Sequence, residues 1–172
     1  MKKTYTSAEA AKLLRLLNEE YDALLTREQK SYSFLAATGE DVESVRPDYN
    51  FARVQEEAAE LEGKIRRLKH AINIFNTTTE VPGFGMTIDA MLIYIPQLTR
   101  RCNKLAIMKS VLPKERDSES FGRSSPIIDY RYANYDVEEA SRRYTEAAEE
   151  LARAQTALDV VNNTITLEFD LD

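Results

Sequence analysis

The side chains best suited to chemistry in this 172-residue sequence are glutamates, which gather in two segments with helical spacing. They are Glu56, Glu57, Glu60, Glu62, Glu138, Glu139, Glu146, Glu149 and Glu150. A pair of carboxylates can hydrolyse a glycosidic bond when a cleft holds the two at a fixed distance. Most of these glutamates instead precede a lysine or arginine by four residues, a spacing typical of exposed ion pairs along a helix. We therefore predict that they stabilise helices rather than catalyse a reaction.

Metal ligands and nucleophiles are scarce in the sequence. His70 is its one histidine and Cys102 its one cysteine. A cysteine-based zinc site, an internal disulfide and the paired Glu-x-x-His motifs of a di-iron site are therefore excluded. Cys102 lies on an apolar stripe, where cysteine usually acts as a small hydrophobic residue. We expect no catalytic residue, no metal, no cofactor and no small-molecule substrate.

Four tyrosines offer an alternative in which the protein is an enzyme. Tyr130, Tyr132, Tyr135 and Tyr144 lie near the junction of a predicted strand and a predicted helix. Together with nearby carboxylates, their phenols could anchor a substrate in a cleft between helices. Tyrosines on a half-buried sheet also pack there without any chemical role, so the sequence leaves this hypothesis as an alternative.

The loop "VPGFG" and the methionine after it form a candidate partner-binding tip. Its apolar side chains are Val81, Phe84 and Met86. The loop lacks the lysine and the Ser/Thr of a phosphate-binding P-loop. Gly83 and Gly85 suit positive φ angles, which favours a corner between two helices. The apolar side chains then either pack back onto the helices or, if exposed, form a tip for a protein or lipid partner.

A basic cluster is the second candidate for partner binding. The segment "KIRRLKH" contains Lys64, Arg66, Arg67 and Lys69. Basic residues near the end of a helix also interact favourably with the helix dipole. The net charge of −6 and the isoelectric point near 5.0 argue against a nucleic-acid-binding protein, so nucleic acid is the least favoured partner.

Four helices are predicted to hold these residues in place. "TSAE" is a capping box that starts the first helix at Thr6. Asn50, Thr87 and Asp136 are the predicted caps of the next three, and Pro113 is expected to stop the third. Apolar residues recur in the second and fourth helices at alternating steps of three and four, which is the heptad pattern of a coiled coil. We call these apolar positions the seam: Phe51, Val54, Ala58, Leu61, Ile65, Leu68, Ile72 and Phe75, and Val137, Ala140, Tyr144, Ala147, Leu151, Ala154, Leu158 and Val161.

Three short segments are predicted strands, at residues 31–38, 126–133 and 164–171. The last alternates apolar and polar side chains, as a strand with one wet face does, and Asn162-Asn163 before it indicates a turn. None of the three could stand alone, so we expect one small sheet at an end of the helices. The predicted fold is mainly α: a single domain over residues 1–172, an elongated antiparallel helical bundle or set of coiled-coil hairpins.

Two segments resemble a known family. "LKHAINIFNTTTEVPGFGMTIDAM" resembles the central corner of the septicolysin-like proteins of bacteria, and "IIDYRYANYDVEEASRRYTEAAEELARAQTALDVVNNTITLEF" is similar to their C-terminal half. "SYSFLAATGEDVESVRPDYN" departs from the family pattern. The resemblance implies a helical protein whose cellular role is unassigned, and it supplies no catalytic residues.

The sequence as a whole predicts a soluble, cytoplasmic protein. The longest uncharged run, "AMLIYIPQLT", is far shorter than the roughly 20 residues of a membrane span, and the N-terminus lacks the apolar core of a signal peptide. Our leading hypothesis is a non-enzymatic structural or interaction protein that forms homo-oligomers through its seams. The alternative is a binding module that uses the 81–86 loop or the 64–70 basic cluster for a protein, lipid or nucleic-acid partner.

Overall fold

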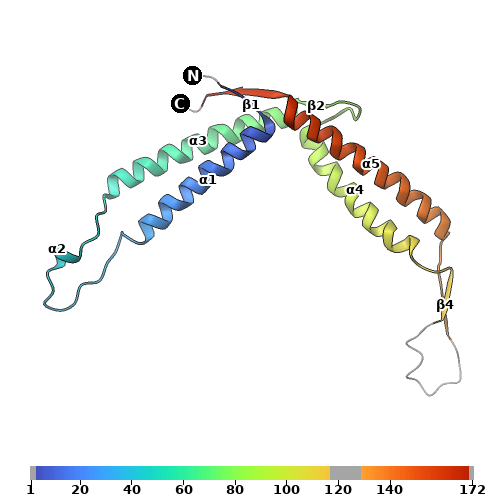
Figure 1. Cartoon of the computed structure of the whole chain (residues 1–172), viewed down its shortest axis with the longest axis horizontal. Helices are drawn as coiled ribbons and strands as arrows, with labels where there is room; N and C mark the ends of the chain where they lie inside the picture. The colour runs from blue at the N-terminus through green and yellow to red at the C-terminus, as the bar shows by residue number, and fades with distance from the viewer. Residues whose placement is uncertain (1–2, 117–128, 171–172) are drawn as a thin grey trace, which may run out of the picture. The chain divides into compact units, whose positions relative to one another are not determined.

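The structure, a computed structural model, describes residues 3–116 and 129–170. It is mainly helical, as predicted (Figure 1). Its helices are α1 (Ser7–Gln29), α2 (Val42–Val45), α3 (Phe51–Thr78), α4 (Ile88–Lys109) and α5 (Val137–Thr164). The four long ones correspond to the four predicted helices, and α2 is a single extra turn in the polar connection between α1 and α3.

The chain divides into two compact units. One is built from the residues up to Thr79 together with those from Val160 onward, and the other is Glu80–Asp159. In the first unit α1 packs along α3, and in the second α4 lies beside α5, as Figure 1 shows. We call these the α1/α3 pair and the α4/α5 pair.

Within residues 3–116 and 129–170, the strands form three small antiparallel sheets of two strands each, rather than the single sheet that the sequence suggested. β1 (Lys3–Thr6) pairs with β6 (Thr166–Phe169), β2 (Glu80–Val81) with β3 (Met86–Thr87), and β4 (Lys114–Arg116) with β5 (Tyr130–Tyr132). Residues 166–169 of the predicted strand 164–171 are therefore extended, as are residues 130–132 of the predicted strand 126–133. Residues 126–128 and 171 lie outside the described part of the chain.

The strand predicted at residues 31–38 is wrong. This segment forms turns and irregular backbone after α1. Its alternating aromatic residues do not line a buried sheet face: Tyr32 is 61% exposed, and Phe34 packs against the Arg46 guanidinium, whose central carbon lies 5.2 Å from the ring centroid. A period of two indicates a strand only where one face is buried, and that condition fails here.

The helix starts follow the predicted caps. Thr6 Oγ1 accepts from the backbone N–H of Glu9, whose carboxylate accepts from the N–H of Thr6, so the capping box is complete. Asn50, Thr87 and Asp136 also accept from amides in the first turns of their helices. The turn predicted at residues 162–163 is wrong, because α5 continues to Thr164. Thr164 donates its hydroxyl to the Val160 carbonyl one turn back, and this bond suits a last helical turn.

The seam positions are the core of each unit, but only one row of them is fully covered. Every seventh residue is buried: Ala10, Leu17 and Leu24 in α1, Val54, Leu61, Leu68 and Phe75 in α3, and Ala140, Ala147, Ala154 and Val161 in α5. Most seam residues between them, such as Ile65, Ile72 and Leu151, are half-buried, and so is Leu14 of α1. Each helix pair therefore has a thin core.

The same order of elements occurs twice along the chain. β1, α1, α3 and β2 follow one another in the first half, and β3, α4, α5 and β6 in the second. The connection between the long helices holds α2 in one half and the β4–β5 sheet in the other. Buried positions keep the same distance from the cap of their helix, so Leu61, Leu68 and Phe75 of α3 correspond to Ala147, Ala154 and Val161 of α5.

Hydrogen bonds repeat along with the elements. Tyr49 and Tyr135 directly precede the caps of α3 and α5, and each donates its hydroxyl, over 2.7 Å, to an acceptor near the end of the preceding long helix. Thr78 and Thr164 end the same two helices, and each donates to the carbonyl four residues earlier. We therefore treat the two halves as structural repeats whose residues correspond one to one within the long helices.

Candidate interaction surfaces

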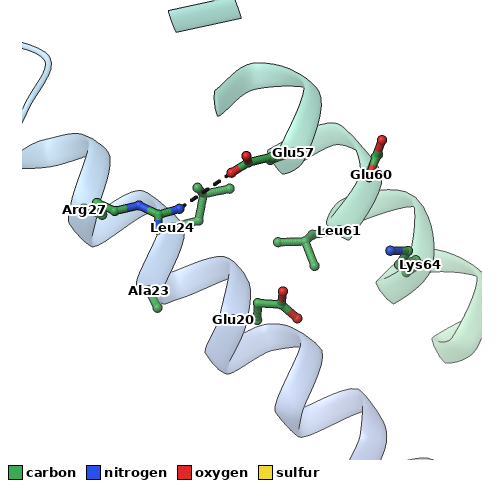
Figure 2. A pocket seen from close by; sticks show the side chains of 8 residues that line it. All are labelled: Glu20, Ala23, Leu24, Arg27, Glu57, Glu60, Leu61 and Lys64. Atoms are coloured by element: carbon green, nitrogen blue, oxygen red, sulfur yellow. Dashed lines mark ion pairs between the residues drawn. The ribbon is translucent and has the colours of Figure 1, made fainter. Parts of the chain in front are cut away.

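A groove of about 280 Å³ lies between α1 and α3 (Figure 2). Its floor is formed by two buried leucines, Leu24 of α1 and the seam residue Leu61 of α3. Its other lining residues are Glu20, Ala23 and Arg27 from α1 and Glu57, Glu60 and Lys64 from α3. We call it the α1/α3 groove. An apolar floor with charged edges is typical of the strip beside a coiled-coil seam.

The charged edges of the α1/α3 groove are only partly neutralised across it. Arg27 lies 3.6 Å from the Glu57 carboxylate, the ion pair dashed in Figure 2. Glu57 also lies 3.4 Å from Arg53 on its own helix. The Arg27 side chain is 69% exposed and that of Glu57 42%, and exposed ion pairs such as these contribute little to folding stability. Their carboxylates and cations remain accessible to a partner.

A second groove, of about 310 Å³, lies between α4 and α5. Its floor includes Leu105 and Ala147, and its other lining residues are Arg101, Lys104, Arg143, Glu146 and Glu150. We call it the α4/α5 groove. Every residue that lines it corresponds, in the repeat, to a residue that lines the α1/α3 groove. The two grooves thus have the same location on their helix pairs.

Tyrosine–carboxylate hydrogen bonds link the helices of each pair. Tyr21 donates to Glu62 over 2.7 Å in the α1/α3 pair, and Tyr94 donates to Glu150 in the α4/α5 pair. The hydrogen bond to the carboxylate is the main reason that the pKa of each phenol is raised above its usual value. Both phenols are therefore protonated donors at neutral pH, and neither is suited to act as a general base.

The predicted partner-binding loop is folded into a tight β2–β3 hairpin. Val81 is buried, and Phe84 and Met86 are half-buried. Gly83 and Gly85 have φ angles of 84° and 60°, as the corner interpretation required. Val81 thus packs back onto the chain, whereas Phe84 and Met86 keep part of their apolar surface exposed.

The predicted basic cluster is divided between two sides of α3. At about 100° per residue, Lys64 and Arg67 face one side of the helix, and Arg66 and Lys69 another. Lys64 lines the α1/α3 groove, whereas the other three are exposed on the helix surface. The structure therefore brings one member of the cluster, Lys64, to a groove and does not assemble the four into one basic surface.

The remaining candidate residues are the four tyrosines, Cys102 and His70. Tyr135 donates to a backbone carbonyl, and cationic side chains lie over the rings of the other three tyrosines: Lys114 over Tyr130 and Tyr132, and Lys109, 3.6 Å away, over Tyr144. Cys102 is buried on α4 as expected, and His70 is exposed. Over residues 3–116 and 129–170, no group of three or more His, Cys, Asp or Glu side chains is arranged to hold a metal ion.

Sequence patterns missed the two grooves because a groove depends on which helices pack together. Glu20, Arg101 and Lys104 look like ordinary surface charges when each helix is considered alone. The available signal was their place beside the seam, since charges there set the pairing of coiled-coil helices.

Comparison with known proteins supports the fold and goes no further. The chain matches no protein-family model and no curated protein. It is similar to a solved structure, the crystal structure of a functionally unknown conserved protein from Corynebacterium diphtheriae, with 21% sequence identity and a TM-score of 0.61. The match covers 96% of this chain and 99% of that chain. Among the helices that the structure describes, none is long and apolar enough to cross a membrane.

Proposed function

We propose that this protein is a non-enzymatic structural or interaction protein that self-associates through its helix pairs. The half-covered seam carries the proposal. In α1, α3 and much of α5 every seventh residue is buried, whereas most seam residues between them are only half-buried. Each pair then acts as an antiparallel coiled-coil hairpin, and helices from a second copy complete a bundle around it.

The energetics of a two-helix core support this proposal. A coiled-coil seam is stable when its apolar side chains insert between those of a facing helix. Two helices alone bury little apolar area, and small cores of this kind contribute only a few kcal/mol to folding. Another helical layer would remove the half-buried row from water and stabilise both copies.

Exposed apolar side chains lie on the groove side of the buried row, and half-buried seam residues such as Ile65 lie on its other side. Leu16 of α1 is 47% exposed and Ile74 of α3 is 50% exposed. Their positions in the heptad place them on the groove side of the α1/α3 pair, next to the half-buried Leu13 and Ala71. Burying such side chains on association contributes roughly 25 cal/mol for each Å² removed from water.

Light scattering on a size-exclusion column, over a concentration series, tests the proposal. We expect a mass above that of one chain, and a variant with Leu16→Ser and Ile74→Ser should dissociate at higher concentration than the wild type. A matched control is Leu35→Ser with Val42→Ser, two exposed apolar residues in the connection between α1 and α3. A wild-type protein that stays monomeric at every concentration would overturn the proposal.

A further inference from the structure

The α1/α3 and α4/α5 grooves carry opposite charges at corresponding positions. Glu20 of α1 corresponds to Arg101 of α4, and Lys64 of α3 corresponds to Glu150 of α5. A third corresponding position holds Glu57 in one groove and Arg143 in the other. Three carboxylates face two cations in the first groove, whereas three cations face two carboxylates in the second. In an antiparallel contact at the level of Glu20 and Lys64, this inversion places opposite charges against each other, whereas Glu57 and Arg143 lie on opposite sides of that level.

We propose, building on the self-association above, that the α1/α3 groove of one copy docks on the α4/α5 groove of a second copy. The helix pairs meet face to face where the two grooves adjoin, at the level of Glu20 and Arg101, with α1 antiparallel to α4 of the other copy. The correspondence of the repeats fixes which charges then meet. When Glu20 is level with Arg101 across the contact, Lys64 is level with Glu150.

The arrangement also covers apolar surface. Adjoining Glu20 on the same side of the α1/α3 pair are Leu13 and Leu16 on α1 and Ala71 on α3. In the antiparallel contact this strip meets the end of α4, where Met108 is half-buried. Two helix pairs packed in this way make four helices around a shared core, which is the usual arrangement of a four-helix bundle. The charges then specify the partner and register, while the apolar strip supplies most of the affinity.

Glu20 and Arg101 are available for such a contact. Both side chains are exposed, and within residues 3–116 and 129–170 neither forms an ion pair. In the isolated chain each charged group is therefore surrounded by water, and a partner can place an opposite charge beside it. Replacing either one removes no described contact of the isolated chain, so its effect on association can be measured without loss of the fold.

A charge-swap experiment tests the docking. Glu20→Arg and Arg101→Glu are made separately, and the dissociation constant is measured by light scattering or analytical ultracentrifugation. Each change places like charges opposite each other, so we expect self-association to weaken roughly fivefold or more. Mixing the two variants brings the arginine introduced at position 20 of one chain opposite the glutamate introduced at position 101 of the other, and should restore association to near the wild-type value.

Asp22→Arg is the matched control, because it makes the same change of charge at an exposed position of α1 about 200° around the helix from Glu20, away from the groove. Circular dichroism of every variant verifies its helix content. If the wild type associates and both swaps behave like the control, the docking is wrong and the proposed self-association stands. A monomeric wild type would overturn both. A chain that carries both Glu20→Arg and Arg101→Glu is measured as well. If this chain recovers the wild-type dissociation constant but the mixture of single variants does not, the two grooves meet within one chain, and docking of a second copy is wrong.

Discussion

At the scale of single residues, the most informative side chain is Tyr94. Its hydroxyl donates to Glu150, whose carboxylate also lines the α4/α5 groove. A hydrogen bond to a carboxylate stabilises folding by about 1 kcal/mol when the pair is partly exposed. We expect Tyr94→Phe to lower the free energy of unfolding by that amount in urea titrations followed by circular dichroism. Tyr32→Phe, at a side chain 61% exposed, is the control and should leave it unchanged.

The same hydrogen bond gives a pH prediction. The Glu150 carboxylate raises the pKa of the Tyr94 phenol above the ordinary tyrosine value of 10.0, mainly through the hydrogen bond. The folded protein therefore holds this proton more tightly than the unfolded chain, and the stabilisation is complete below pH 10 and lost as pH rises through the folded-state pKa. We expect the difference in tyrosinate absorbance between wild type and Tyr94→Phe to have its midpoint above pH 10. A midpoint below 10 would show that the hydrogen bond does not form in solution.

At the scale of elements, the packing of the seams differs between the repeats. Leu68 in α3 and Ala154 in α5 correspond to each other, and both are fully buried. Truncating a buried leucine removes its contacts and leaves a cavity, so Leu68→Ala should lower the free energy of unfolding by about 3 kcal/mol. Ala154→Leu should lower it by about 2 kcal/mol, because the added side chain overfills a closely packed site.

Chemical denaturation measures both variants against a surface control. Leu92→Ala is suitable because Leu92 is 49% exposed on α4, and it should change the free energy of unfolding by less than about 1 kcal/mol. If Leu68→Ala were as mild as this control, the buried row could not be the core of the α1/α3 pair.

How much the sequence revealed depended on whether a signal was local to one element. The Thr6 capping box lies within one helix, and the structure confirms it. The seam of α3 also lies within one helix, and its positions Val54, Leu61, Leu68 and Phe75 are buried, whereas Phe51 is 65% exposed. Contacts between residues distant in sequence were not predicted. β1 pairs with β6, and the ring centroids of Tyr5 and Phe169 lie 5.1 Å apart in that sheet. Period and composition describe one segment at a time, so they cannot specify such pairing.

The repeat was overlooked for a related reason. The connections differ between the halves, so the spacing between corresponding residues changes from one helix to the next. Core residues also differ in size, as Leu61 and Ala147 show. The signals that the halves share were small: a threonine cap at Thr6 and Thr87, and a tyrosine directly before the next cap. Such residues become informative only when the structure shows that the two threonines cap their helices alike and that each tyrosine donates to an acceptor near the end of the preceding long helix.

At the scale of the whole molecule, the distribution of charge over the surface matters more for self-association than the net charge does. The chain carries a net charge of −6, which makes two copies repel each other at long range. The two grooves nevertheless have complementary charges, with Glu20 in one and Arg101 in the other. Electrostatics therefore acts on association in two opposing ways, one through the whole surface and one through the contact.

The sign of the salt dependence shows which of these effects is larger. The screening length falls from about 10 Å at 0.1 M salt to about 3 Å at 1 M, so salt weakens both the general repulsion and the attraction between grooves. Charges in contact dominate at short range, and we therefore expect self-association of the wild type to weaken as salt rises from about 0.1 M to about 1 M. In Glu20→Arg the same rise in salt should strengthen association, because it then screens a repulsive contact. Sedimentation at the two salt concentrations measures both proteins. Stronger association of the wild type at high salt would mean that repulsion between the net charges outweighs attraction between the grooves, so that apolar burial against Leu16 and Ile74 rather than groove charge holds the copies together.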